Sequence, residues 1–477
     1  MISPIGYFLI PAALVIFVRG LRTLLWATLA LVPFTAVQVI DIGVTTIAGF
    51  QFFGVLFIAR CLIDTVWSGS RGLERSRANA LAALFLFVCF ASLSMAVIKA
   101  GTVEVYTETQ GRWIDVVRNS GPLQFSTFNL TQILYPTFGI LLFHFLVREL
   151  RSVADLRKTI NILVGGALVI AVMSIASGAL YTMGRGGLYE QVLGLFSVGP
   201  PGAKNPESAS IGEFLRMYTL AGEPGFTAMT LLAGAGLVAG DVLRSGESVI
   251  RQPTIKLFIL GAALLFNGST TGYFGAGLLI LWAIMALWYV GRGSLGTTIR
   301  ALGVVLGSLV LIAALASTIQ VSGLSFYEWL TEYHLAKLQG EGVGSGQIRS
   351  YVTWYTLETV FLSSPILGVG YGSHLSLSLV TFLLANVGLV GFGVFLAFLY
   401  TAFRNARKTA RSAQGPLRKM AFMAAVVFVP FLTTLFVAKA TSGINYGLTW
   451  TIIALAEVTY QVHRRQRRRV GRRAQAA

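Results

Sequence analysis

The sequence predicts an all-α, polytopic integral membrane protein with about 12–13 transmembrane helices and a long loop late in the chain. Of the 477 residues, 55% are hydrophobic and only 12% are charged, whereas a soluble domain carries about 25% charged residues. Apolar runs of about 20 residues, the length that crosses a bilayer, recur along the chain. The basic residues gather between alternate runs. We therefore expect one membrane domain over residues 1–477, without a large soluble part.

The apolar runs place the spans in chain order. The first run has no Lys or Arg before it and no small-residue cleavage site after it, so we expect a retained span rather than a signal peptide. Two later runs are almost continuous around Asn267, which predicts either two crossings or a re-entrant hairpin. The predicted spans are 5–18, 23–40, 42–66, 79–99, 124–147, 159–183, 223–243, 255–268, 272–291, 299–320, 376–403, 420–441 and 443–462.

The charges predict an orientation. If alternate loops are cytoplasmic, they hold 28 of the 37 Lys and Arg residues, and the outer side holds 12 of the 19 acidic residues. The positive-inside rule then places the basic loop 404–419 and the tail 463–477 in the cytoplasm. The outer loops are 100–123, 184–222 and 321–375. We interpret the tail as a topology anchor, in preference to a nucleic-acid or anionic-lipid site, so no nucleic-acid partner is expected.

Several classes of site find no support in the sequence. There is no phosphate-binding P-loop, dinucleotide fingerprint or metalloprotease motif, so nucleotide hydrolysis, a cofactor and a metal site are not expected. Cys61 and Cys89 lie in apolar runs far from any histidine, which predicts packing rather than a disulfide or zinc. No inverted pair of broken helices indicates a secondary transporter.

Arg216 and Glu223 flank the entry to the predicted span 223–243, in the segment FLRMYTLAGEPGF. Proline suits the first helical turn and the helix dipole favours a carboxylate there, so one interpretation is an ordinary helix start with a surface arginine. The other is an arginine that binds phosphate and a carboxylate that acts as a base or holds the arginine. The residues leave both open.

Arg349 begins a predicted amphipathic helix, because Tyr351, Trp354 and later apolar residues recur near helical spacing. One interpretation is a helix that lies on the outer face with aromatic anchors. The other is a ligand-binding surface in which the guanidinium binds an anion and the rings contact a ligand.

Two glycine-containing segments carry further polar residues. The run GVGYGSH contains Tyr371 and His374, and its backbone N–H groups suit either an anion site or a plain turn. His374 is a candidate general base. Tyr273 follows the break Asn267–Gly268–Ser269 in apolar sequence, where hydroxyls can satisfy freed backbone groups, so a structural use is favoured.

In this order, these features resemble the O-antigen ligase and O-antigen polymerase superfamily, multi-span proteins that join lipid-linked glycans on the outer face of the bacterial inner membrane. The resemblance covers most of the chain and implies a GT-C-like fold. It rests on the many spans with one long late outer loop, the Arg216 to Pro224 span entry and the Gly-Ser-Thr-Thr-Gly break. It also rests on the Arg349 helix, the following SPILGVGYGS and the late span LSLVTFLLANVGLVGFGVFLAFLY.

One departure bears on the branch of the family. Ligases of the family usually carry a His-Asn pair at the start of the late span, at a position near Leu377–Ser378 in this chain. No His-Asn stands there, and His374 lies about one helical turn earlier. The departure favours the polymerase branch, especially the exopolysaccharide type, over ligation to a lipid A core.

The resemblance implies polymerisation of polyprenyl-diphosphate-linked repeat units into exopolysaccharide or O-antigen, without a metal or cofactor. Arg216 and Arg349 would bind the diphosphate, and Glu223, with His374 as second choice, would deprotonate the acceptor. Four aromatic side chains would stack on sugar rings: Tyr351, Trp354, Tyr371 and Tyr273.

The membrane lipid and a chain-length regulator protein are the further partners that this interpretation implies. Two alternatives stay open: a ligase that transfers the glycan to a lipid or protein acceptor, and a transporter or flippase of the lipid-linked glycan. Transporters tend to place charges along a central cavity, whereas most charges here lie at span ends.

Overall fold

The computed structural model describes the chain in several stretches, and nearly all of it that is described is helical. The described residues are 1–43, 46–68, 76–107, 120–183, 185–197, 210–211, 214–215, 218–290, 296, 299, 303, 320–321, 324–325, 345–438 and 441–476. Within them, eight helices are long and apolar enough to cross a membrane, and three shorter helices are also apolar. The predicted all-α polytopic membrane protein is thereby confirmed.

The long candidate spans are α3 (Gly49–Ser68), α4 (Arg77–Ile98), α6 (Thr127–Glu149), α7 (Val153–Thr182), α9 (Pro224–Leu243), α11 (Thr270–Tyr289), α16 (Leu379–Ser412) and α17 (Gly415–Ala438). The shorter apolar helices are α1 (Gly6–Arg19), α2 (Leu21–Leu31) and α10 (Pro253–Phe266). The remaining described helices are α8 (Gly186–Gly194), α15 (Ser345–Tyr355), the π-helix η3 (Thr356–Phe361), α18 (Thr441–Asn445) and α19 (Gly447–Ala476).

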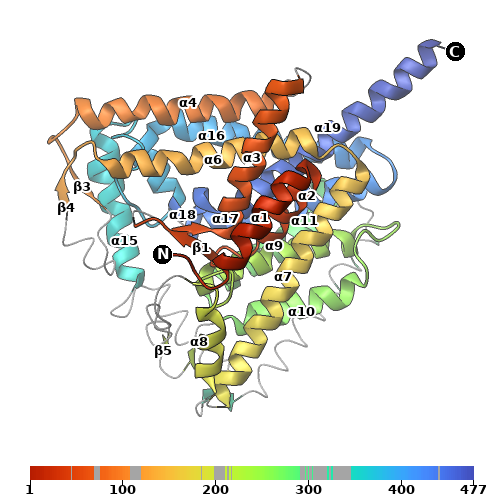
Figure 1. Ribbon diagram of the computed structural model, residues 1–477, viewed down its shortest axis with the longest axis horizontal. Helices are drawn as coiled ribbons and strands as arrows, with labels where there is room; N and C mark the ends of the chain where they lie inside the picture. The colour runs from red at the N-terminus through yellow and green to blue at the C-terminus, as the bar shows by residue number, and fades with distance from the viewer. Residues whose placement is uncertain are drawn as a thin grey trace.

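Short antiparallel hairpins join some of the helices. They pair β1 (Gln38–Asp41) with β2 (Thr46–Ala48), β3 (Glu104–Tyr106) with β4 (Ser120–Pro122), β5 (Ser210–Ile211) with β6 (Phe214–Leu215), and β7 (Gln320–Val321) with β8 (Leu324–Ser325). In Figure 1 β3, β4 and α15 lie at one end of the bundle, and α19 projects from the other.

The spans predicted from apolar runs mostly coincide with helices, but the β1–β2 hairpin occupies the end of the predicted span 23–40 and the start of the predicted span 42–66. The predicted span 23–40 is wrong in its second half, because α2 ends at Leu31 and the chain continues into β1. Pro33 follows that end, and proline cannot donate the backbone hydrogen bond that would continue the helix. The predicted span 299–320 lies almost entirely outside the residues that the structure describes.

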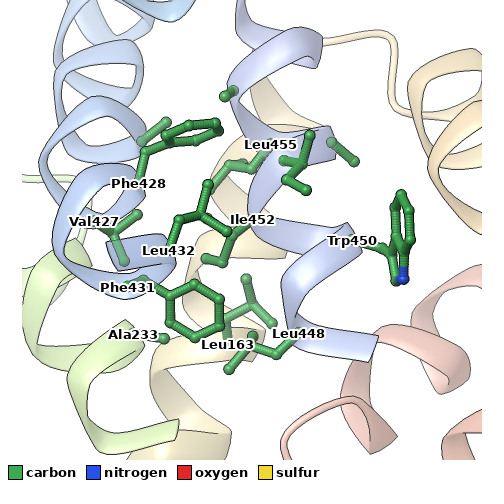
Figure 2. Packing of buried hydrophobic residues seen from close by; sticks show 14 of the residues in the cluster. Leu163, Ala233, Val427, Phe428, Phe431, Leu432, Leu448, Trp450, Ile452 and Leu455 are labelled. Atoms are coloured by element: carbon green, nitrogen blue, oxygen red, sulfur yellow. The ribbon is translucent and has the colours of Figure 1, made fainter. Parts of the chain in front are cut away.

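The core forms where α17 packs on α9, α11, α16 and α19. Figure 2 shows Phe431 and Leu432 of α17 against Ile452 of α19. Small residues allow such close packing: a Cβ at Gly139 of α6 would lie 2.0 Å from the Trp450 Nε1 atom of α19. In lipid, where apolar surface alone does not drive helices together, this close approach holds the bundle.

α9 and α17 pack in a register that the glycines of α9 reveal. A Cβ at Gly236 would lie 3.0 Å from Val427, and one at Gly240 would lie 2.6 Å from Met423. Because the α17 partner moves back by four residues as α9 advances by four, the two helices are antiparallel. This register positions the candidate site described below.

Helix α16 is broken at Gly388, and a segment from elsewhere in the chain fills the break. Gly388 has φ of 63° and ψ of −168°. The segment 363–378, called here the inserted segment, approaches the break. Its Val369 N–H donates to Ala385 O at 2.8 Å, and its Pro365 O accepts from Leu389 N–H at 2.8 Å. The backbone groups that a broken helix leaves unpaired are thus bonded inside the protein, as membrane depth requires.

Gly388→Ala is expected to destabilise the protein by about 3 kcal/mol or more. A left-handed backbone costs an L residue about 1–2 kcal/mol, and the new Cβ would lie 2.2 Å from Ile366 O, adding overpacking strain. Gly393→Ala in the same helix is the matched control, since nothing lies within 4 Å of its added Cβ. Thermal unfolding in detergent measures both variants. Equal midpoints for G388A and wild type would contradict the prediction.

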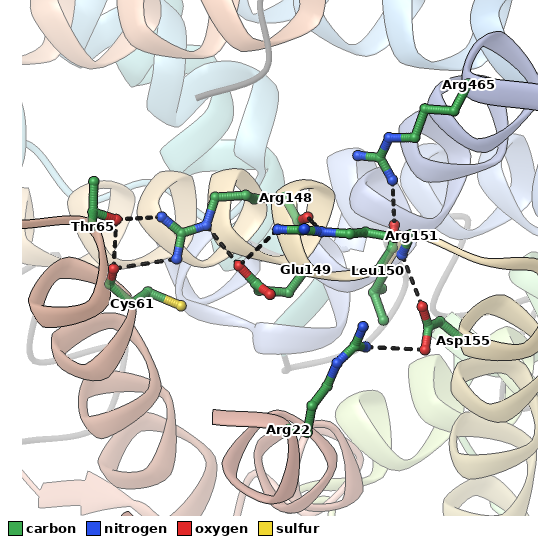
Figure 3. Close-up of polar contacts among 9 residues, drawn as sticks. All are labelled: Arg22, Cys61, Thr65, Arg148, Glu149, Leu150, Arg151, Asp155 and Arg465. Carbon is green, nitrogen blue, oxygen red and sulfur yellow. Dashed lines mark hydrogen bonds and ion pairs between the residues drawn. The ribbon is translucent and has the colours of Figure 1, made fainter. Parts of the chain in front are cut away.

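Charged residues form an ion-pair layer at one end of the bundle, called here the basic end. Arg22–Asp155 and Arg157–Glu247 each join two segments that the charge count assigns to the cytoplasmic side, and Lys419–Asp241 joins the basic loop 404–419 to the end of the predicted span 223–243. In Figure 3 Arg148 lies between Glu149, with Nε 2.8 Å from Oε1, and the Cys61 carbonyl, with Nη2 3.2 Å from the oxygen. Arg22 pairs with Asp155 at 3.0 Å. Segments that the charge pattern assigned to one side of the membrane therefore do meet in space.

Candidate functional site

The two site clusters predicted from sequence lie at the end of the bundle opposite the basic end. Arg349 Nη1 donates to Ala438 O at 3.4 Å, in the last turn of α17. The antiparallel pairing of α9 and α17 can be extended from Gly236 toward the N-terminus of α9 by about three turns. The first turn of α9 then lies beside the last turn of α17, which contains Ala438. Glu223 immediately precedes that turn. The fold therefore brings Arg349 and Glu223, 126 positions apart in the sequence, to one end of one helix pair.

Glu223 is exposed at the N-terminus of α9, after a tight turn. Thr219 and Gly222 exchange backbone hydrogen bonds at 3.1 and 2.8 Å, and Gly222 adopts φ of 104°, a conformation that favours glycine. The Glu223 carboxylate does not cap α9. It is exposed at the end of the bundle opposite the basic end and lies near the positive end of the helix dipole.

Arg349 fastens α15 to two other elements. Besides Ala438 O, its Nη1 donates to Leu377 O at 3.3 Å, just before α16 begins. A cation at the C-terminus of α17 is favoured by the helix dipole. The side chain is nevertheless exposed, so its guanidinium combines a fixed position with access to a ligand. The predicted helix is present as α15, but it begins at Ser345, before Arg349.

Aromatic rings form a strip from the surface of α15 inward. Tyr351 and Trp354 are 56% and 59% exposed. The Tyr351 ring stacks on Tyr355 with centroids 6.5 Å apart, and Tyr355 lies 4.7 Å from the ring of Tyr106. Tyr106 comes from β3, so no local pattern in the sequence could have placed it there. The open faces of Tyr351 and Trp354 suit contact with a sugar ring, which stays a prediction.

His374 lies at the buried end of this strip. It is 0% exposed, its Nδ1 accepts from Tyr106 N–H at 3.2 Å, and its Nε2 lies 2.9 Å from Thr356 Oγ1. Thr356 Oγ1 in turn donates to Val352 O at 2.6 Å. Because Nδ1 accepts, the proton is on Nε2 and the ring is neutral. Burial lowers the pKa of His374 to about 3.

The protein is expected to lose stability between pH 6.5 and 5 through His374. The folded-state pKa of about 3 lies below the unfolded value near 6.5, so the unfolded chain binds more protons in this interval. The contribution is complete above pH 6.5 and falls by about 1.4 kcal/mol per pH unit below it, or about 2 kcal/mol at pH 5.

Thermal unfolding of wild type and His374→Gln at a series of pH values isolates this contribution. The stability difference between wild type and the variant should shrink as pH falls from 6.5 to 5. A difference that stays constant would contradict the buried neutral histidine.

The glycine run of the inserted segment is buried and its amides are used inside the protein. Tyr371 N–H donates to Ser92 Oγ at 3.1 Å, and His374 N–H donates to Asn386 Oδ1 at 3.0 Å. The anion-site interpretation of these amides therefore fails. Tyr371 is 1% exposed, and Phe382 packs edge-on against it, so its ring offers no open face to a sugar in this structure.

The break before Tyr273 contacts the start of α9. Asn267 Nδ2 donates to Pro224 O at 2.8 Å, which ties the turn between α10 and α11 to the start of α9. Tyr273 Oη donates to Leu265 O at 2.6 Å, so its hydroxyl closes the same turn. The structural use expected of this break is seen here, while a sugar contact by Tyr273 stays a prediction.

Arg216 lies outside the described residues, as does most of the predicted loop 321–375 before Ser345. Within the described part of the chain, no group of three His, Cys, Asp or Glu residues is placed to hold a metal ion. Comparison of the chain with known protein families and with curated proteins finds no match.

Proposed function

We propose that this protein polymerises polyprenyl-diphosphate-linked oligosaccharide repeat units into exopolysaccharide or O-antigen on the periplasmic face of the bacterial inner membrane. The observation that carries the proposal is that Arg349 and Glu223 lie at one end of the α9–α17 pair, opposite the basic end. A cation and a carboxylate accessible at the same membrane boundary are the two groups that this transfer needs. The fold would then be GT-C-like, with the C-terminus in the cytoplasm, as the positive-inside rule indicates.

In the proposed reaction, a hydroxyl of the acceptor glycan attacks the anomeric carbon of the donor. A new glycosidic C–O bond forms while the bond from that carbon to the diphosphate oxygen breaks, and the electron pair leaves with the lipid diphosphate. Glu223 takes the hydroxyl proton as general base. Arg349, with Arg216 as a second arginine, stabilises the charge that develops on the diphosphate. The diphosphate bond supplies the driving force, so no nucleotide is consumed.

Two features of the site support this assignment of roles. Arg349 is held by two backbone carbonyls, so its charge is positioned before the donor binds. His374, the second candidate base, is enclosed and bonded through both ring nitrogens, which favours a role in holding the inserted segment against β3. The exposed rings of Tyr351 and Trp354 follow Arg349 on α15 and would contact the glycan.

Reconstitution of the purified protein in lipid tests the proposal. The reaction contains short polyprenyl-diphosphate-linked repeat units and no nucleotide, and product length is measured by gel. Longer lipid-linked chains are the expected result. Transfer that begins only when a foreign lipid or protein acceptor is added would instead assign the ligase, and movement of the substrate across the bilayer without transfer would assign a flippase.

A further inference from the structure

Helix α16 carries four basic residues on one face near its C-terminal end, inside the predicted cytoplasmic loop 404–419. Arg404, Arg407, Lys408 and Arg411 stand at positions i, i+3, i+4 and i+7, which lie on one side of an α-helix. We call these four residues the basic face of α16. Like charges three and four residues apart repel one another, so the helix by itself does not favour this arrangement.

No acidic residue in the described part of the chain pairs with Arg404, Arg407 or Lys408. Helices α11 and α16 contain no aspartate or glutamate, and the six ion pairs among the described residues involve other basic side chains. On the neighbouring helix α19, the Glu457 carboxylate accepts instead from Asn405 Nδ2 at 2.7 Å and from Gln461 Nε2 at 2.6 Å. The positive charge of these three residues therefore has no counterion within ion-pair distance among the described residues.

Two arginines of the basic face converge on the C-terminal end of α11. Arg407 Nε donates to Tyr289 O at 3.1 Å, and Arg411 Nη2 donates to the same oxygen. Arg407 Nη1 also donates to Tyr289 Oη at 2.9 Å, and its Cζ lies 3.7 Å from the centre of that ring. The helix dipole favours a cation at this end, but it supplies only a partial negative charge for two full positive charges. The shared carbonyl thus holds two guanidinium groups close together, where a bound anion would offset their repulsion.

Exposed apolar and aromatic side chains lie next to the basic face, on the side toward the membrane. On α16, Leu396 and Tyr400 precede Arg404 by eight and four residues, so they lie on the same side of the helix, and both are exposed. On α11, Met285 and Trp288 are exposed just before the helix ends. Tyr and Trp at this level are typical of the boundary between hydrocarbon and headgroups. The surface therefore changes from apolar to aromatic to basic, in the order in which a phospholipid changes from acyl chain to phosphate.

We propose that an anionic phospholipid of the cytoplasmic leaflet binds at the ends of α11 and α16, with its phosphate between Arg404 and Arg407. The Cβ atoms of residues three apart on a helix are about 5–6 Å from each other, so both side chains reach one phosphate group. Arg404 is exposed, and Arg407 already uses only Nε and Nη1, so its Nη2 can donate to a phosphate oxygen. Basic sites between membrane helices on the cytoplasmic side bind such headgroups. The positive-inside rule explains the sign of the charge, but it does not require two arginines to share one carbonyl beside an exposed third.

Titration of phosphatidylglycerol into the purified full-length protein in neutral detergent tests the inference, with bound lipid measured by native mass spectrometry. Arg404→Gln is the main variant, because Arg404 is exposed and its replacement should not disturb the fold. Arg157→Gln is the matched control, since it removes the same charge from the basic end at a residue that pairs with Glu247. Phosphatidylglycerol should bind about fivefold more weakly to R404Q than to wild type, and equally to R157Q and wild type. Arg407→Gln should weaken binding by a similar factor.

Two further probes identify the ligand. Phosphatidylcholine, whose headgroup has no net charge, should bind more weakly to wild type than phosphatidylglycerol does, and equal binding of the two lipids would overturn the inference. Inorganic phosphate that binds as tightly as phosphatidylglycerol would show a site for a free anion rather than a lipid. Equal weakening in R404Q and R157Q would show that only net charge matters, which would also overturn the inference. None of these measurements needs turnover, so their outcome is independent of the proposed polymerase function.

Discussion

Arg349→Ala is expected to slow glycan elongation by about 10²–10³-fold. The guanidinium is placed by Leu377 O and Ala438 O, so in the proposed mechanism it meets the diphosphate without a cost of reordering. Loss of one preorganised group that stabilises developing charge typically has this effect. Arg349→Lys keeps the charge but not the planar donor set, so it should recover only part of the rate. The measurement is elongation of lipid-linked repeat units in reconstituted membranes.

The control for this variant is Arg157→Ala at the basic end. Arg157 pairs with Glu247 at 3.0 Å, and both side chains are substantially exposed, so its removal should change neither elongation nor stability appreciably. Equal rates for R349A and R157A, at matched protein levels in the membrane, would remove Arg349 from the reaction. It would then be only a residue that fastens α15 to α17.

Glu223→Gln is expected to lower the elongation rate by about 10²–10⁴-fold, the usual contribution of a general base. Glutamine is nearly the same size as glutamate but cannot accept the acceptor's proton at neutral pH. Because Glu223 is exposed and interactions of exposed charges contribute little to stability, the thermal midpoint should hardly change. Donor binding should also be kept, so the loss should appear in the rate at saturating donor.

Glu358→Gln provides the matched control, since Glu358 is another exposed carboxylate, located on η3 after the aromatic strip. Its replacement should leave elongation unchanged. If E223Q and E358Q elongate at the wild-type rate, Glu223 is not the base. Loss of rate in both variants would indicate that negative charge at this end matters, rather than one proton acceptor.

The sequence by itself determined the class of fold, the position of most helices and the grouping of the charges. Hydrophobic length is a local property, so α4, α6 and α17 appear close to the runs 79–99, 124–147 and 420–441. Charge placement is local too, and the ion pairs join segments that the charge pattern had already grouped. The predicted span 23–40 differs from the structure because the helix ends just before Pro33. Apolar composition alone did not indicate this helix end.

Only the tertiary structure decided which residues meet and which are accessible. At the break at Gly388, Pro365 and Val369 of the inserted segment hydrogen-bond to backbone groups of α16. A glycine in the sequence does not indicate which distant residues will pair with the backbone around it. His374 is enclosed because Tyr106, on β3, packs against it and donates its N–H to Nδ1. The candidate base is therefore a buried neutral ring. Arg349 and Glu223 reach one end through the α9–α17 register. Such contacts depend on close packing between segments far apart in the chain, which local hydropathy does not encode.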